Sequence, residues 1–161
     1  MVRQRERNVD PDLAILLVGA SRAVADALQL ALEAAGIDGM RSAFGFVLRA
    51  VGDDGATLTD LAQRLAVTKQ AAIKVVDEME RRGFVERLPH PGDRRAKVIA
   101  PTERGRHVRA TALAASRRME RDLRRAAGDG DVDALRRALS AFLDQHGGLD
   151  EAVAGRARPV W

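Results

Sequence analysis

Hydrophobic side chains recur with a helical period along most of this chain. The first series begins at Leu13 and Leu16 and continues through alanines and valines as far as Gly36. Asp10 as the N-cap and Pro11 at the first helical position predict where this helix begins. Its apolar stripe is long and rich in alanine, which is more than a solitary short helix needs. We therefore expect it to pack on a partner chain.

The same period predicts five further helices. They cover about residues 39–51, 58–65, 69–82, 103–127 and 131–146. Thr57 with Asp60 resembles a capping box before the third helix, Thr68 is placed to cap the fourth, and Gly83 ends it. These boundaries predict short helices with well-marked ends in the middle third of the chain, between long terminal helices.

Two short segments after the fourth helix have strand character. They are residues 84–88 and 96–100. The segment between them, residues 89–95, contains Pro and Gly and predicts a hairpin loop longer than a two-residue turn. The fold class expected is mainly α with a small β-hairpin.

The helix predicted at residues 69–82 has a polar face suited to DNA. Its core-facing positions are Ala72, Val75, Val76 and Met79. The opposite face holds Lys69, Gln70, Ile73, Lys74 and Asp77. Lys donates to guanine, Gln pairs with adenine, and Ile contacts a thymine methyl group. With the short helix and tight turn before it, this segment predicts a helix-turn-helix whose second helix reads the major groove.

The predicted hairpin supplies a second set of basic side chains. Arg94 and Arg95 near its tip are expected to enter a minor groove, where the negative potential attracts arginine. Asp93 has the wrong charge for DNA, so we interpret it as a residue that orients Arg95 or a nearby arginine. Lys97 adds a further cation. A single exposed Lys or Gln is usually only solvated, but a helix-turn-helix followed by a charged hairpin favours DNA contact.

Composition is consistent with one domain in the cytoplasm. The chain has 161 residues, of which 46% are hydrophobic and 31% charged, which excludes a disordered chain. A charged N-terminal segment predicts no signal peptide, and no uncharged apolar run reaches membrane-spanning length. Only three of the 27 basic residues are lysine. Arginine suits nucleic-acid recognition, but a high-GC genome produces the same bias.

The middle third resembles a known family of regulators. Gly83-Phe84-Val85-Glu86-Arg87, Gly92-Asp93-Arg94-Arg95-Ala96-Lys97 and Thr102-Glu103-Arg104-Gly105 stand in order. The Asp-x-Arg pattern and the Thr-Glu-x-Gly start of the next helix are similar to the MarR family of bacterial transcriptional regulators. The resemblance implies a winged helix-turn-helix with long dimerisation helices.

The resemblance also implies an arrangement of regions and partners. Residues 1–36 would form an N-terminal tail and dimerisation helix, 37–104 the DNA-binding region, and 105–148 the C-terminal dimerisation helices. A flexible tail would follow at 149–161. Family members are homodimers that read pseudo-palindromic double-stranded DNA, and many are repressors released by a small effector. By position, the contacts would be Thr68, Lys69, Gln70, Lys74 and Arg95.

Other sites are not expected. With no cysteine, thiol sensing is excluded, and the three histidines lie on separate elements, so no metal or other cofactor is predicted. With 3% aromatic residues and no tyrosine, an aromatic-lined effector pocket is not evident. Arg106 and Arg109 are placed to contact backbone phosphate. The later arginines of that helix would be solvated or pair with acidic groups of the dimer partner.

The sequence leaves three alternatives to a sequence-specific regulator. An enzyme receives little support, since no catalytic triad order, phosphate loop or metal-ligand spacing is present. A winged helix used for protein interaction would lose the basic residues that this chain keeps. A non-specific architectural binder would depend on phosphate contacts and show little sequence preference.

Overall fold

The structure is a computed structural model that describes residues 11–146. Its helices are α1 Leu13–Ala34, α2 Ser42–Val51, α3 Leu58–Arg64, α4 Lys69–Arg81, α5 Glu103–Ala127 and α6 Asp129–Gln145. Its strands are β1 Ala56–Thr57, β2 Val85–His90 and β3 Asp93–Pro101. The predicted fold class is confirmed. The tail predicted at residues 149–161 lies outside the described residues.

The beginning of α1 differs from the prediction. Asp12 is the N-cap, and its carboxylate accepts a hydrogen bond from the Ile15 N–H at 2.9 Å. Pro11 therefore precedes the helix instead of occupying its first position, and Asp10 lies outside the described residues. Two aspartates flank the proline, and the one that follows it is three residues from a free N–H.

The hairpin, called the wing below, also differs from the prediction. β2 and β3 pair antiparallel from Val85↔Pro101 to His90↔Asp93, so only Pro91 and Gly92 remain in the turn. The predicted loop over residues 89–95 is wrong because most of it belongs to the strands. Pro89 is tolerated there next to an irregularity in the register between Pro89 and His90.

A third strand was not predicted from the sequence. β1 has two residues and pairs antiparallel with β3, through Ala56↔Ile99 and Thr57↔Val98, giving the sheet order β1-β3-β2. Thr57 was recognised only as a helix cap, and it has both roles. A two-residue strand is too short for any alternation of polar and apolar positions to reveal it.

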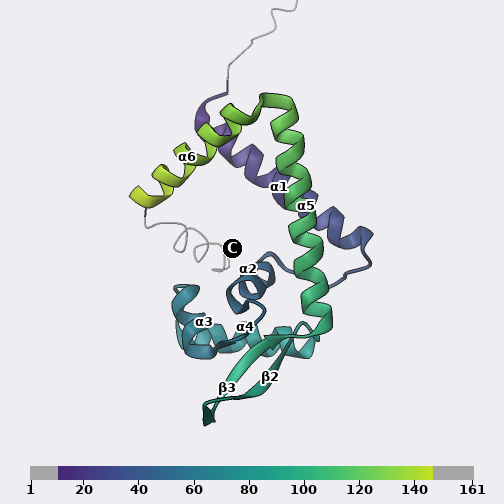
Figure 1. The fold of residues 1–161 in the computed structure, drawn as a ribbon, viewed down its shortest axis with the longest axis vertical. Coiled ribbons are helices and arrows are strands. Elements are labelled where there is room, and N and C mark those ends of the chain that lie inside the picture. The colour runs from purple at the N-terminus through teal and green to yellow at the C-terminus, as the bar shows by residue number, and fades with distance from the viewer. Residues whose placement is uncertain (1–10, 147–161) are drawn as a thin grey trace, which may run out of the picture.

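The hydrophobic core lies between α2, α3, α4 and the sheet. Its largest fully buried side chains are Phe44, Phe84, Leu48, Leu61, Met79 and Ile99, from α2, α3, α4 and the sheet region. By contrast, Leu32 is the buried residue of α1 and Val132 that of α6. Figure 1 shows the long α5 connecting the wing and helix-turn-helix at the bottom with α6 at the top, while α1 crosses α5.

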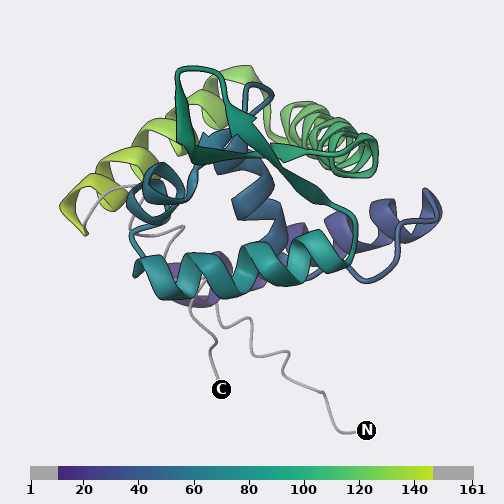
Figure 2. The same cartoon turned by 90° about the horizontal axis from the view of Figure 1, so that it is seen from below.

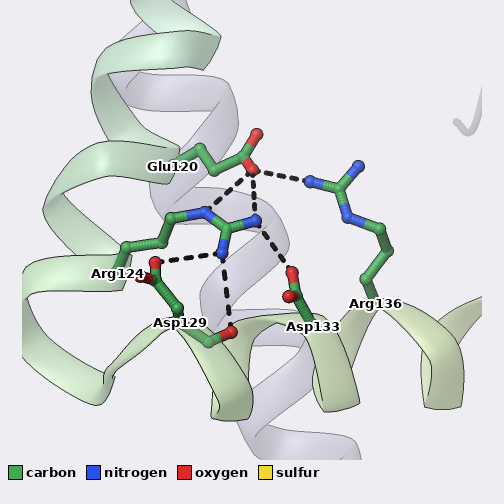
Figure 3. A network of polar contacts seen from close by, with 5 residues as sticks. All are labelled: Glu120, Arg124, Asp129, Asp133 and Arg136. Atoms are coloured by element: carbon green, nitrogen blue, oxygen red, sulfur yellow. Dashed lines mark hydrogen bonds and ion pairs between the residues drawn. The ribbon is translucent and has the colours of Figure 1, made fainter.

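A polar network joins the end of α5 to α6 (Figure 3). The Arg124 guanidinium contacts Asp133 at 2.9 Å, Glu120 at 3.0 Å and Asp129 at 3.1 Å, and Arg136 reaches Glu120 at 2.7 Å. The hydrogen bond from Arg124 is the main reason that the pKa of Glu120 lies below its usual value. Arg124, expected to be solvated or paired with a partner chain, thus pairs within its own chain.

One described helix, α1, is long and apolar enough to cross a membrane by length and composition alone. Arg22 and Asp26 interrupt its sequence, which is why a search for an uncharged run does not find it. None of its most apolar 18-residue window is buried within the chain. The apolar surface of α1 is therefore left uncovered by the rest of the described chain.

Candidate nucleic-acid interface

The helix-turn-helix consists of α3, a short turn and α4. Ala66 in the turn adopts a positive φ of 46°, and the Thr68 hydroxyl caps α4 by accepting the Ala71 N–H at 3.2 Å. Ala72, Val76 and Met79 bury the inner face of α4, as predicted. Val75, predicted to face the core with them, is only half-buried. The opposite face of α4 is thereby directed outward.

The outward face of α4 carries the predicted base-reading residues. Lys69, Gln70 and Lys74 are exposed, whereas Ile73 is half-buried. All four lie in the N-terminal half of α4, the part that enters the groove in helix-turn-helix proteins. Figure 2, viewed from below, shows α4 and the wing on the same lower face of the molecule.

The wing brings further basic residues to this face. Arg94 and Arg95 follow Asp93 in the first part of β3, and Lys97 is exposed farther along the same strand. Asp93 begins β3 opposite His90, whose Nδ1 accepts the Gly92 N–H at 3.1 Å. The predicted role of Asp93 in orienting Arg95 stays a prediction.

An arginine clamp, not predicted from the sequence, holds the wing against α4. Arg87 of β2 forms ion pairs with Asp77, at 2.5 Å, and with Glu80, both on α4. Helical periodicity predicts Asp77 on the face that contacts DNA, but in the structure Asp77 pairs with Arg87 of β2. Two acids three residues apart on a helix, followed by an arginine in the next strand, are the signal that sequence reasoning overlooked. These ion pairs fix the angle between α4 and the wing.

The C-terminal end of α4 is tied to the segment between α1 and α2. Glu78 pairs with Arg82 at 2.8 Å and with Arg41 at 3.0 Å. Arg82 also donates to the Gly39 carbonyl at 2.9 Å and lies 5.6 Å from the centre of the Phe44 ring. These contacts hold α4 at its far end, so its exposed face has a defined position.

The capping box of α3 is present as predicted. The Asp60 carboxylate accepts hydrogen bonds from the Thr57 hydroxyl at 2.8 Å and from the Thr57 N–H at 3.2 Å. The Thr57 hydroxyl in turn accepts the Asp60 N–H. Chiefly because of the side-chain hydrogen bond from Thr57, the pKa of Asp60 lies below its usual value. The first helix of the motif thus begins at a fixed residue.

The start of α5 is packed closely on the end of β3 and on Phe84. Thr102 caps α5, and its hydroxyl donates to the Gly83 carbonyl at 2.6 Å. Gly105 is buried so close to the Phe84 carbonyl that a β-carbon at this position would lie 2.0 Å from its oxygen. The Arg104 guanidinium carbon lies 4.8 Å from the centre of the Phe84 ring, and the same guanidinium pairs with Asp38. The Thr-Glu-x-Gly pattern is thereby explained as a cap plus a close-packing glycine.

A cavity of about 760 Å³ lies between α1, α2 and α5, and no residue of α4 or the wing lines it. Its walls are mainly aliphatic, and Phe46 is the aromatic residue among the lining side chains described. Arg106 and Arg109 line this cavity. Arg109 pairs with Asp53 at 2.5 Å, and Arg106 donates to the Pro101 carbonyl at 2.6 Å. Within residues 11–146, no group of His, Asp and Glu suited to hold a metal ion is present.

Comparison with known proteins gives consistent matches. A family model described as the MarR family matches residues 45–96. The transcriptional activatory protein BadR of Rhodopseudomonas palustris is 31% identical over 129 residues, which cover 78% of this chain and 73% of BadR.

Two solved structures are also similar to the chain. CouR from Rhodococcus jostii RHA1, bound to p-coumaroyl-CoA, is 30% identical with a TM-score of 0.59, and the match covers 81% of this chain and 91% of CouR. A MarR-family regulator from Rhodococcus sp. RHA1 is 28% identical with a TM-score of 0.58, covering 84% of this chain and 95% of that protein.

Proposed function

Because the chain belongs to the MarR family of transcriptional regulators, we propose that it acts as a homodimer that reads a pseudo-palindromic DNA operator. In this proposal α4 lies in the major groove and the wing in the adjacent minor groove. The observation that carries it is the exposed polar face at the N-terminal half of α4, held beside the basic wing by Arg87.

The proposed contacts separate into two kinds. Gln70, Ile73 and the lysines of α4 contact base edges, which gives sequence preference. Arg94, Arg95 and Lys97 of the wing contact the minor groove and phosphates, with Asp93 orienting the arginines, and Thr68 contacts phosphate at the start of α4. Phosphate contacts add affinity that depends on salt but not on sequence.

The proposed dimer follows from surface that the single chain leaves uncovered. Leu13 and Val18 of α1 are 69% and 71% exposed, and Phe142 of α6 is 51% exposed. Large apolar side chains exposed along both helices favour an interface there. We assign dimerisation to residues 1–36 and 105–148 and DNA binding to residues 37–104. The apolar character of α1 then serves dimerisation in the cytoplasm rather than membrane insertion.

A small-molecule effector is part of the proposal. The cavity between α1, α2 and α5 has the size typical of ligand sites, and it adjoins both proposed regions. Its mainly aliphatic walls suit a ligand with apolar surface. The resemblance to the MarR family favours a repressor, whereas the relative BadR is named an activatory protein. A reporter gene placed under the operator distinguishes repression from activation.

The test is fluorescence anisotropy with DNA from upstream of the protein's own gene, beside a random duplex of equal length. Gln70→Ala should cost about 1–3 kcal/mol at the preferred site and relax preference at particular base pairs. Arg95→Ala should weaken binding to all sequences and reduce the salt dependence by about one unit of slope. Asp54→Asn, in the exposed turn after α2 and outside the proposed DNA contacts and dimerisation helices, is the control and should bind as the wild type does.

The outcomes distinguish the proposal from its alternatives. Equal and strongly salt-dependent binding to both duplexes would favour an architectural DNA-binding protein. Binding to neither duplex would favour a protein-interaction module. DNA affinity unchanged by both substitutions would refute the docking of α4 and the wing described above.

A further inference from the structure

The α5–α6 corner, residues 124–133, is not fixed by its backbone alone. Gly128 joins the two helices with a φ of 91°, a positive value that favours glycine, and it precedes α6 without any capping side-chain hydrogen bond. Beyond the corner α6 extends away from α5, and among the described elements it packs mainly against that helix (Figure 1). Val132 is the buried residue of α6. The angle between α5 and α6 therefore depends on polar side chains at the corner.

Arg124 supplies most of the polar contacts at the corner (Figure 3). Its backbone carbonyl accepts the Gly128 N–H at 2.8 Å. Its Nε and Nη2 contact Glu120 on α5, at 3.2 Å and 3.0 Å. Its Nη1 contacts Asp129 at 3.1 Å, and Nη2 contacts Asp133 at 2.9 Å, both on α6. A planar guanidinium with donors in fixed directions holds several carboxylates at defined angles, which the compact charge of a lysine does not.

A second link between the helices uses the same carboxylate. Arg136 of α6 donates to Glu120 at 2.7 Å, through the oxygen that also accepts from Arg124. The two helices are thus joined by two arginines, one from each helix. The Arg124 side chain is 28% exposed. Isolated surface ion pairs contribute little, but a network of several charges around one arginine holds its members in place.

The long α5 transmits any change at the corner to the DNA-binding region. It has 25 residues, which corresponds to a length of about 37 Å. Its other end is capped by Thr102 and packed through Gly105 on Phe84. A rotation of about 5° at the corner would move the far end of such a helix by about 3 Å, close to the rise of one base pair, about 3.4 Å. The angle between α5 and α6 is therefore relevant to how two subunits fit DNA.

We propose that Arg124 is a positioning residue: by fixing the angle between α5 and α6 it sets the separation of the two copies of α4 in the dimer, and with it the half-site spacing that the protein accepts. The inference rests on the proposed function, because it takes α6 as part of the dimer interface and α4 as the element that reads each half-site. It adds the contact that converts dimerisation into a defined operator spacing.

The absence of cysteine from the sequence allows this separation to be measured directly. Arg81→Cys, at the exposed end of α4 and outside the proposed DNA contacts, takes one nitroxide label per chain. Pulsed electron paramagnetic resonance then gives the distance between the two labels of a dimer. The labelled protein should show a narrow distribution of distances. Adding Arg124→Gln should broaden the distribution, because α6 then takes a range of angles on α5.

Arg125→Gln is the matched control for this substitution. It removes the same charge from the neighbouring residue, whose side chain is 76% exposed and pairs within its own helix, and it should leave the distribution narrow. Arg124→Lys keeps the charge but not the planar fork, so it should broaden the distribution as well. Asp133→Asn should broaden it less, and adding Asp133→Asn to Arg124→Gln should change nothing further, because the partner is already absent.

DNA binding tests the consequence for operator spacing. Half-sites located by footprinting upstream of the protein's own gene are moved apart or together by one base pair, and the affinity for each altered duplex is compared with that for the natural one. The wild type and Arg125→Gln should bind the altered duplexes at least about tenfold more weakly, whereas Arg124→Gln should discriminate by about twofold or less. A general loss of stability does not change this ratio, because the same folded fraction binds both duplexes.

The outcomes separate this inference from the proposed function. Label distances that stay narrow in dimers of both Arg124→Gln and Asp133→Asn would overturn the inference alone, as would an unchanged spacing ratio in Arg124→Gln. Equal broadening by Arg125→Gln would also overturn it, because loss of charge rather than the corner contacts would then be the cause. A wild type that gives no distance between labels, as a monomer would, or a dimer that binds no DNA would instead refute the proposed function.

Discussion

At the scale of single residues, Gly105 decides how closely α5 approaches the sheet. Gly105→Ala would place a β-carbon against the backbone of Phe84, which cannot turn away as a side chain could. We expect a loss of about 1–3 kcal/mol in the free energy of unfolding, typical of an overpacked buried site. Urea denaturation measures it.

The control for this substitution is Gly130→Ala. Gly130 lies in the first turn of α6, where an added β-carbon meets nothing within 4 Å. Alanine there should be neutral or slightly stabilising, because it restricts the unfolded chain. If both variants lost the same stability, close packing at Gly105 would not be the cause.

Single residues also differ in how far the sequence could predict them. The exposure of Lys69, Gln70 and Lys74 was predictable, because helical periodicity that buries Ala72 and Val76 directs the other face outward. The pairing of Arg87 with α4 was not, since it depends on where β2 crosses the helix. Local periodicity contains no information about contacts between separate elements.

At the scale of elements, the α3 cap should give the protein a pH dependence. The pKa of Asp60 is lower in the folded protein than its usual value of 3.8, so the unfolded chain binds the proton more tightly. The stability that the cap contributes is therefore present above about pH 4 and is lost as the pH falls through the lowered folded value.

Asp60→Asn removes this contribution. The variant should unfold at lower urea concentration than the wild type at pH 7, and the difference should shrink below pH 4. Thr57→Ala, which removes the hydrogen-bonding partner, should show the same trend. Asp144→Asn on the exposed surface of α6 controls for the loss of one carboxylate. A gap between wild type and Asp60→Asn that stays constant from pH 7 to pH 3 would contradict the assignment.

Element boundaries were predictable where a cap or glycine marks them. Thr57, Thr68 and Thr102 each cap the helix expected of them, and Gly128 separates α5 from α6. The prediction of a loop over residues 89–95 was wrong because Pro and Gly do not interrupt strand pairing throughout this segment. In the fold, cross-strand hydrogen bonding continues to His90 and Asp93 and leaves two residues for the turn.

At the scale of the whole molecule, buried apolar side chains are distributed unequally between the core and the long helices. The large buried side chains belong to the middle of the chain, whereas α1 and α6 each bury one residue. The apolar stripes of these helices were visible in the sequence. The sequence did not reveal which residues of these stripes are covered within the chain, because that depends on how α5 separates the two ends (Figure 1).

The dimer proposed to cover this surface can be tested on α6. Leu135 and Phe142 are seven residues apart on one helix face and are 43% and 51% exposed. Light scattering should give the wild type twice the chain mass of 17.4 kDa, and Leu135→Glu with Phe142→Glu should give the single mass. The melting temperature of the variant should become independent of protein concentration, because folding is no longer linked to association.

Leu88→Glu supplies the matched control, since Leu88 is 42% exposed but lies on the wing, at the opposite end of the molecule from α6. It should remain dimeric. The double α6 variant should lose affinity for a two-half-site operator, while its salt-dependent binding to random DNA persists, because only paired subunits contact two half-sites one helical turn apart. A double variant that keeps the wild-type mass and operator affinity would exclude this face of α6 from the dimer interface.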